Sequence, residues 1–256
     1  MLRITTVQAQ LFWEDREANF RHLETLLAPL RETDLIILPE MFSSGFSMNS
    51  EKLAEQMNGT TVKWLQFMAS EKNAVITGSF IAVENGNYYN RLIWVQPDGN
   101  FHVYNKRHLF SLAGEDKFYT PGKKRLEVEW KGWKICPLIC YDLRFPVWSR
   151  NDTAFDVLIY VANWPRPRIQ AWNTLLTARA IENQCFTIGV NRVGNDAVGN
   201  EYSGNSCITD FAGNTLYKAA EVEDVFTITL EKEGLLDFRQ KLPFLNDRDD
   251  FSIISA

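Results

Sequence analysis

The sequence lacks the features that mark several whole classes of protein. No apolar run in its 256 residues approaches the ~20 residues that span a bilayer, and the N-terminal segment lacks the long apolar region of a signal peptide. With 27 basic and 32 acidic residues, it has no basic excess that would suit nucleic acid or an anionic membrane. Its four cysteines form no Cys-x-x-Cys pair, which argues against a zinc ribbon or a thioredoxin-type site. These absences predict a cytoplasmic protein that binds neither nucleic acid nor membrane.

The composition that is present is ordinary for a globular protein, with 45% hydrophobic and 23% charged residues. No linker rich in Pro, Ser or Gly interrupts the chain, and no repeat with the period of a solenoid is visible. We therefore expect one domain over residues 1–256.

Strand-like and helix-like segments alternate along the chain. Helices are expected at residues 15–30, 60–72 and 169–183, the second with Thr60 as its N-cap. Hairpin turns are expected at Asn85-Gly86 and Asp98-Gly99. Strands are expected at residues 4–9, 35–38, 74–80, 101–104, 130–139, 157–162, 186–190, 205–210, 215–218 and 225–230. So many strands exceed one small sheet, which predicts an α/β fold of two packed mixed sheets covered by helices.

Cys140 follows a buried strand in the stretch KICPLICYDLRFP, and Pro146 suits the first turn of a following helix. Functional groups in open α/β sheets gather at the carboxyl ends of strands. Backbone N–H groups and helix-dipole charge at such a position would favour the thiolate. The alternative is a buried structural cysteine, because free cysteine is among the most buried residue types.

Two more residues whose side chains can take part in catalysis also follow predicted strands. Glu40 ends the strand in DLIILPEMFSSGF among bulky apolar side chains, a setting that suits a general base. Lys106 in YNKRHLF follows residues 101–104, and a cation near a thiol can stabilise an oxyanion. Taken singly, the alternatives are a solvated loop glutamate and a surface lysine.

The constellation of Glu40, Lys106 and Cys140, in this order, resembles the nitrilase or carbon–nitrogen hydrolase superfamily. LPEMFSSGF matches the glutamate motif, YNKRHLF the lysine motif and ICYDLRFP the cysteine motif. The resemblance extends from TTVQAQ at the first strand to FTITL near the end. It implies a four-layer αββα sandwich, a homodimer, hydrolysis of a non-peptide amide or related C–N bond, and neither a metal nor an organic cofactor.

These residue types suit the hydrolysis of an amide, which is a poor electrophile. Cys140 would attack the carbonyl and release ammonia, leaving a thioester. Glu40 would take the thiol proton, deliver it to the leaving amine and then activate water. Lys106 and the backbone N–H of Tyr141 would hold the tetrahedral oxyanion.

The resemblance also suggests residues around this triad. The family carries a second active-site glutamate, which Glu115 in LAGEDKFYTPG would supply unless it is a solvated loop acid. Arg144, four residues after Cys140, could hold a substrate carboxylate, or it could pair structurally with an acid such as Asp142. Asn163 and Trp164 match the family's substrate-side loop, although Trp164 could equally be a core aromatic.

The motif series looks most like the ω-amidases that act on 2-oxoglutaramate. N-carbamoyl amino acid hydrolases, deaminated-glutathione amidases and true nitrilases are the alternatives within the superfamily. A redox sensor that uses Cys140 as a switch is a different class, but it would need neither Glu40 nor Lys106. A Cys–His amidase or protease would need His22, His102 or His108, the only histidines. His22 lies within a helical apolar pattern and suits a helix boundary better than a base, and His108 has no obvious orienting acid.

Overall fold

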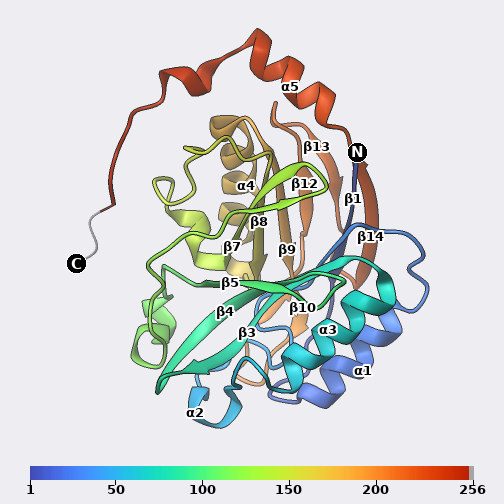
Figure 1. Cartoon of the computed structure of the whole chain (residues 1–256). Coiled ribbons are helices and arrows are strands. Elements are labelled where there is room, and N and C mark those ends of the chain that lie inside the picture. Colours follow the sequence, from blue (N-terminus) through green and yellow to red (C-terminus); the bar gives the residue numbers. More distant parts are fainter. Residues whose placement is uncertain (254–256) are drawn as a thin grey trace.

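The computed structural model describes residues 1–253 and contains two six-stranded sheets (Figure 1). The first sheet has the spatial order β14 (Asp224–Leu230), β1 (Leu2–Gln8), β2 (Leu35–Ile37), β3 (Val75–Glu84), β4 (Asn87–Val95) and β5 (Phe101–Asn105). The second has the order β13 (Thr215–Lys218), β12 (Cys207–Thr209), β9 (Phe186–Asn191), β8 (Val157–Ala162), β7 (Trp133–Ile139) and β6 (Val128–Trp130). A small hairpin adds β10 (Val193–Asn195) and β11 (Glu201–Ser203).

Both sheets are mixed, as the sequence predicted. Strands β1, β2 and β3 are parallel in the first sheet, and β7, β8 and β9 are parallel in the second. The outer strands pair antiparallel to these central strands. The hairpin turns expected at Asn85-Gly86 and Asp98-Gly99 connect β3 to β4 and β4 to β5.

Helices cover the outer faces of the two sheets and complete the predicted αββα sandwich (Figure 1). Helices α1 (Arg16–Leu27) and α3 (Thr60–Lys72) pack on the first sheet, and α4 (Ile169–Asn183) packs on the second. The remaining helices are α2 (Ser50–Leu53), α5 (Lys232–Lys241) and short 3₁₀ turns at Ser111–Ala113, Glu115–Lys117, Cys140–Arg144, Arg166–Arg168 and Phe244–Asp247. No helix within residues 1–253 is both long and apolar enough to cross a membrane.

Three turns or helix starts differ from the sequence-based expectation. Thr60 is the first residue of α3 and Gly59 is its N-cap, because the carboxylate of Glu55 accepts the Thr61 N–H that a cap would bind. The strand expected at 130–139 is two strands, because Lys131 and Gly132 have positive φ and form a hairpin turn between β6 and β7.

The third difference follows Cys140. No helix begins at Pro146; instead a 3₁₀ turn over Cys140–Arg144 ends at Phe145, whose N–H bonds the carbonyl of Asp142. Asp142 also accepts the N–H of Ile139 through its side chain, which holds the chain in a tight turn directly after β7. The local bonding of Asp142 therefore shapes this segment.

The two sheets place several strand ends side by side. Strand β2 leads to Glu40, β5 to Lys106, β7 to Cys140 and β8 to Asn163. β7 and β8 are parallel neighbours in one sheet, whereas β2 and β5 belong to the other. The polar side chains therefore meet between the sheets, above a core in which apolar residues of both sheets pack together.

Candidate active site

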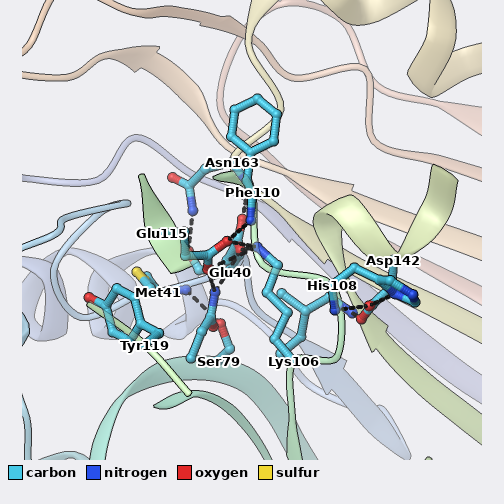
Figure 2. A network of polar contacts seen from close by, with 12 residues as sticks. Glu40, Met41, Ser79, Lys106, His108, Phe110, Glu115, Tyr119, Asp142 and Asn163 are labelled. Carbon is cyan, nitrogen blue, oxygen red and sulfur yellow. Dashed lines mark hydrogen bonds and ion pairs between the residues drawn. The ribbon is translucent and has the colours of Figure 1, made fainter. Parts of the chain in front are cut away.

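Glu40 lies at the centre of a fully buried polar cluster (Figure 2). The next residue, Met41, has φ of 45°, and its N–H donates to Ser79 Oγ over 2.9 Å, which fixes the turn after the strand. Glu40 Oε1 accepts hydrogen bonds from Lys106 Nζ and Asn90 Nδ2, both at 2.8 Å. Its Oε2 accepts the backbone N–H of Asn163 at 2.8 Å. The carboxylate is therefore held on both oxygens.

Lys106 lies between two carboxylates. Its Nζ is 2.8 Å from Glu40 Oε1 and 2.9 Å from Glu115 Oε2, and all three side chains are completely buried. Burial alone would lower the pKa of Lys106, but the charges of Glu115 and Glu40 outweigh it and raise this pKa above its ordinary value. Lys106 is therefore a permanent cation in this cluster.

Glu115 joins the cluster from the loop after Lys106. Its Oε2 accepts the N–H of Phe110 at 2.5 Å, and its Oε1 accepts Asn90 Nδ2 at 3.0 Å. Burial and the charge of Glu40 raise the pKa of Glu115, while Lys106 opposes this shift. The alternative of a solvated loop acid is wrong, because Glu115 is completely buried.

Asn90 is a member of the cluster that sequence reasoning missed. It lies on β4, is completely buried, and donates through one amide nitrogen to both Glu40 and Glu115. Its only sequence signal is a polar residue before the apolar run Leu92–Val95, which is also typical of a strand leaving the core. The hydrogen bonds become visible only when β4 and β2 are placed in one sheet.

Cys140 lies at the edge of this cluster, on a turn with φ of 42°. It is partly exposed and lines a cavity, so a small molecule can reach it. Burial of the thiol and the charge of Glu40 raise the pKa of Cys140 well above its ordinary value, and Lys106 opposes them. The sequence predicted surroundings that favour the thiolate, whereas burial of the thiol, followed by the charge of Glu40, shifts its pKa in the opposite direction.

Asp142 braces the turn that carries Cys140, a role that sequence reasoning missed. This buried carboxylate accepts Tyr104 Oη at 2.7 Å, and its other oxygen is 2.8 Å from His108 Nδ1. Figure 2 shows His108 and Asp142 together, apart from the Glu40 cluster. Arg144 does not pair with Asp142 but lies over the ring of Trp164 instead. The hydrogen bonds of Asp142 to Tyr104 and His108 therefore connect the turn that carries Cys140 to the segment that carries Lys106.

The histidines do not complete a Cys–His pair. His108 has an acid after all, Asp142, but it stacks on Phe145 and does not line the cavity beside Cys140. His22 pairs with Glu223, and His102 lies exposed on β5. Among residues 1–253, no group of three or more His, Cys, Asp or Glu side chains is arranged to hold a metal ion.

The cavity beside Cys140 has a volume of about 300 Å³. Residues of the two sheets, the loop after Lys106 and the β10–β11 hairpin line it: Phe46, Phe110, Leu112, Ala113, Cys140, Tyr141, Arg144, Asn163, Trp164, Pro165, Arg168, Asn200 and Tyr202. This volume suits a molecule of about ten heavy atoms. The sequence-predicted residues Cys140, Tyr141, Arg144, Asn163 and Trp164 all belong to the wall.

Asn163 and Trp164 each have a structural role as well as a place in the wall. The side chain of Asn163 donates to the backbone oxygen of Glu40, and its backbone N–H binds the Glu40 carboxylate. Trp164 is 3% exposed, and its ring centroid is 5.5 Å from that of Trp172, so it is also a core aromatic. Both interpretations of Trp164 therefore hold at once.

The arrangement fits nucleophilic chemistry with proton transfer. The pKa of the Cys140 thiol is raised by burial and by the charge of Glu40, and that carboxylate can accept the thiol proton when an electrophile arrives. A permanent cation lies beside that carboxylate, where negative charge would develop.

Comparison with known proteins identifies the family to which the chain belongs. A family model described as carbon-nitrogen hydrolase matches residues 3–240. The chain belongs to the carbon-nitrogen hydrolase family. This confirms the resemblance inferred from the three motifs, and with it a hydrolase acting on C–N bonds.

Relatives of this carbon-nitrogen hydrolase include enzymes with named amide substrates. It is 44% identical to the omega-amidase YafV of Yersinia enterocolitica, over 99% of both chains. It is 32% identical to the 2-oxoglutaramate amidase of Bacillus subtilis (strain 168), over 85% of both chains. Its structure matches that of XC1258 from Xanthomonas campestris, a CN-hydrolase superfamily protein with an arsenic adduct in the active site, with a TM-score of 0.96, 45% identity and 98% coverage of both chains.

Proposed function

We propose that this hydrolase cleaves a short ω-amide that carries a carboxylate at its other end, with 2-oxoglutaramate as the leading substrate and 2-oxoglutarate and ammonia as products. The observation that carries the proposal is the cavity that Cys140 and Arg144 both line. The omega-amidase and 2-oxoglutaramate amidase relatives support the same substrate class.

In the proposed mechanism, Cys140 Sγ attacks the amide carbon while Glu40 accepts the thiol proton. Glu40 then passes that proton to the leaving nitrogen, the C–N bond breaks, and ammonia departs from a thioester. Water next gives a proton to Glu40 and adds to the thioester. The C–S bond breaks, the carboxylic acid leaves, and the proton returns to sulfur.

The raised pKa of Cys140 supports this coupling of proton transfer to attack. Lys106 and the Tyr141 N–H hold the oxyanion, since Lys106 is a permanent cation and Tyr141 follows the nucleophile on the cavity wall. Glu115 is a positioning residue, because its two contacts with Lys106 hold the ammonium in place.

Arg144 binds the substrate carboxylate in this proposal. Its guanidinium lies 5.0 Å from the Trp164 ring centroid, which orients it as part of the wall. Asn163 and Trp164 shape the wall between the nucleophile and this anchor. A planar guanidinium can bind a carboxylate through two parallel hydrogen bonds, which fixes both the position and the direction of the substrate.

We further propose a homodimer of single-domain subunits, each formed by residues 1–256, in the cytoplasm. Free cysteines at positions 136, 140, 185 and 207 suit a reducing compartment. Light scattering after size-exclusion chromatography tests the dimer, and a monomer at micromolar concentration would contradict it.

The experiment that tests the proposed function is ammonia release from a panel of amides at equal concentration. The panel contains 2-oxoglutaramate, an N-carbamoyl amino acid, a nitrile and the amide of an uncharged fatty acid. We expect the highest kcat/KM for 2-oxoglutaramate, and none from Cys140→Ala. Preference for the carbamoyl compound or the nitrile would contradict the substrate and leave the Glu40–Lys106–Cys140 mechanism standing.

A further inference from the structure

The cavity wall contains a second guanidinium, that of Arg168, which has no role in the mechanism proposed above. Arg168 ends the 3₁₀ turn Arg166–Arg168 and directly precedes α4. Its guanidinium carbon lies 5.0 Å from the centroid of the Phe110 ring, in the loop that also carries Glu115. Arg144 and Arg168 therefore each lie over an aromatic ring, and both line the same cavity.

The two arginines have a common support. The indole Nε1 of Trp164 donates to the carbonyl oxygen of Arg168 at 2.8 Å, and the face of the same indole carries Arg144. Trp164 therefore contacts both arginines, Arg144 at its guanidinium and Arg168 at its backbone. Two guanidinium groups on the wall of one cavity can bind two oxygen acceptors of a ligand.

No acid balances this pair within the cavity. Among the described residues that line it, Arg144 and Arg168 are the charged side chains, and within the described chain neither forms an ion pair with a carboxylate. Arg166 is two residues away from Arg168 and pairs with Glu201 and Glu221. Tyr202 Oη and Asn200 Nδ2, which also line the cavity, both donate to Asp196, which does not line it.

Two unpaired positive charges favour oxygen-rich, anionic ligands and oppose cationic ones. A 2-oxo acid offers a carboxylate and an adjacent carbonyl oxygen, which are acceptors for two guanidinium groups. A 2-amino acid places an ammonium group at the same carbon atom. That ammonium would meet two like charges and no acid, which is a repulsive contact in a partly buried space.

We propose that Arg168, together with Arg144, is a specificity-determining residue that admits ω-amides with oxygen substituents at the distal end and rejects those with an α-ammonium group. The inference rests on the proposed function and adds the reason why the amide of a 2-amino acid is a poor substrate. Arg168 acts on the choice of substrate, whereas Glu40, Lys106 and Cys140 act on the reacting bond.

Three amides with the same five-carbon chain test the inference, because they differ only at the second carbon atom: 2-oxoglutaramate, the monoamide of glutaric acid, and glutamine. We expect wild type to hydrolyse glutamine least well. Arg168→Gln should lower kcat/KM for the two anionic amides and spare glutamine, so that their preference over glutamine falls by about tenfold. Arg168→Lys should keep the rejection of glutamine, because it keeps the charge.

Arg31→Gln is the matched control, since Arg31 is exposed and outside the cavity, and it should leave all three kcat/KM values unchanged. Thermal melts of each variant report whether the fold survives. An equal loss on all three amides, or an unchanged preference in Arg168→Gln, would overturn the inference and leave the proposed function intact. Inactivity of wild type on all three would overturn the proposed function itself.

Discussion

The buried cluster of Glu40, Lys106 and Glu115 and the arginines of the cavity wall both surround Cys140, but their charges are satisfied differently. In the cluster, each charge has a partner within 3.1 Å, and no side chain is exposed. On the wall, Arg144 and Arg168 rest on aromatic rings and have no carboxylate partner within the described chain. The charges of the cluster are paired with one another in the absence of substrate, whereas the two arginines of the wall are free to pair with an anionic ligand.

Under the proposed mechanism, the buried cluster carries out the reaction and the arginines of the wall recognise the substrate. Buried charges that are fully hydrogen-bonded keep their positions during catalysis, so they stabilise a transition state without reorganising. Breaking one such pair leaves an uncompensated buried charge and is strongly destabilising. Unpaired charges on an accessible wall contribute little to the fold and instead bind ligands. Changes in the cluster should therefore reduce kcat or stability, and changes on the wall should affect the choice of substrate.

The largest expected effect comes from Glu40→Gln, which keeps the shape of the cluster and removes its base. We expect kcat to fall by about 10²–10⁴-fold, the range usual for loss of a general acid–base. The pKa of Cys140 should fall at the same time, because the charge of Glu40 helps to raise it. Alkylation of Cys140 by iodoacetamide should therefore begin at lower pH than in wild type while amide hydrolysis is lost.

Lys106→Met is the opposing control for this experiment. Removing the cation should raise the pKa of Cys140 further, so alkylation should begin at higher pH than in wild type. A fall in kcat is expected in both variants, although their thiol titrations move in opposite directions. If hydrolysis followed the thiolate fraction in both variants, the coupled proton transfer to Glu40 would be wrong.

Glu40, Lys106, Cys140 and Glu115 could be predicted from the sequence, whereas Asn90 and Asp142, which also hold the cluster and the cysteine turn, could not. Glu40, Lys106 and Cys140 each follow a strand and have side chains with recognisable chemistry. Asn90 and Asp142 look like ordinary polar residues, because their roles depend on hydrogen bonds between segments far apart in the chain. The direction of the Cys140 pKa shift failed for the same reason. It depends first on the burial of the thiol and then on the charges of Glu40, Lys106 and Glu115, which only the packed sheets bring together.

The layered architecture of two sheets covered by helices could be predicted from the sequence, and the wrong predictions concern single turns and helices. Helix 169–183 and strands 157–162 and 215–218 have the expected bounds, because their apolar patterns end at clear polar or glycine signals. The turn at Lys131-Gly132 was missed, since it lies between two tryptophans that continue the apolar run on both sides. The amphipathic α5 was not expected, because it buries only Leu235.

Asn90→Leu should have the next largest effect, and it tests whether neutral members of the cluster matter. The change removes one donor from each of two buried carboxylates, and a hydrogen bond to a charged group is worth about 1.5–3 kcal/mol. We expect kcat to fall by at least about tenfold and the melting temperature to drop. Asn87→Leu, on the same strand but exposed, is the control and should change neither. Unchanged kcat in Asn90→Leu would show that Lys106 and the Asn163 N–H suffice to orient Glu40.

Arg144→Ala tests whether the cavity wall binds the substrate carboxylate. Loss of a charge-assisted, two-pronged bond should lower kcat/KM for a carboxylate-bearing amide by about ten- to a hundredfold. Arg144→Lys should restore little, because lysine offers a point charge without the planar fork. The amide of an uncharged fatty acid should be cleaved slowly by wild type and equally slowly by the variant. Equal losses on charged and uncharged amides would make Arg144 a structural residue.

The smallest expected effect is the response to salt, which separates the two regions without any mutation. Salt screens exposed charges strongly and buried pairs weakly, because mobile ions cannot approach the latter. Raising NaCl from about 0.05 M to about 0.5 M should therefore raise KM for 2-oxoglutaramate by about threefold, since exposed Arg144 is screened. The kcat value should stay constant, because the ion pairs of Lys106 have no exposure. Arg144→Ala should flatten the KM response, and a neutral amide should show none in wild type. A fall of kcat with salt at constant KM would place screened charge in the catalytic cluster and would contradict the division of roles.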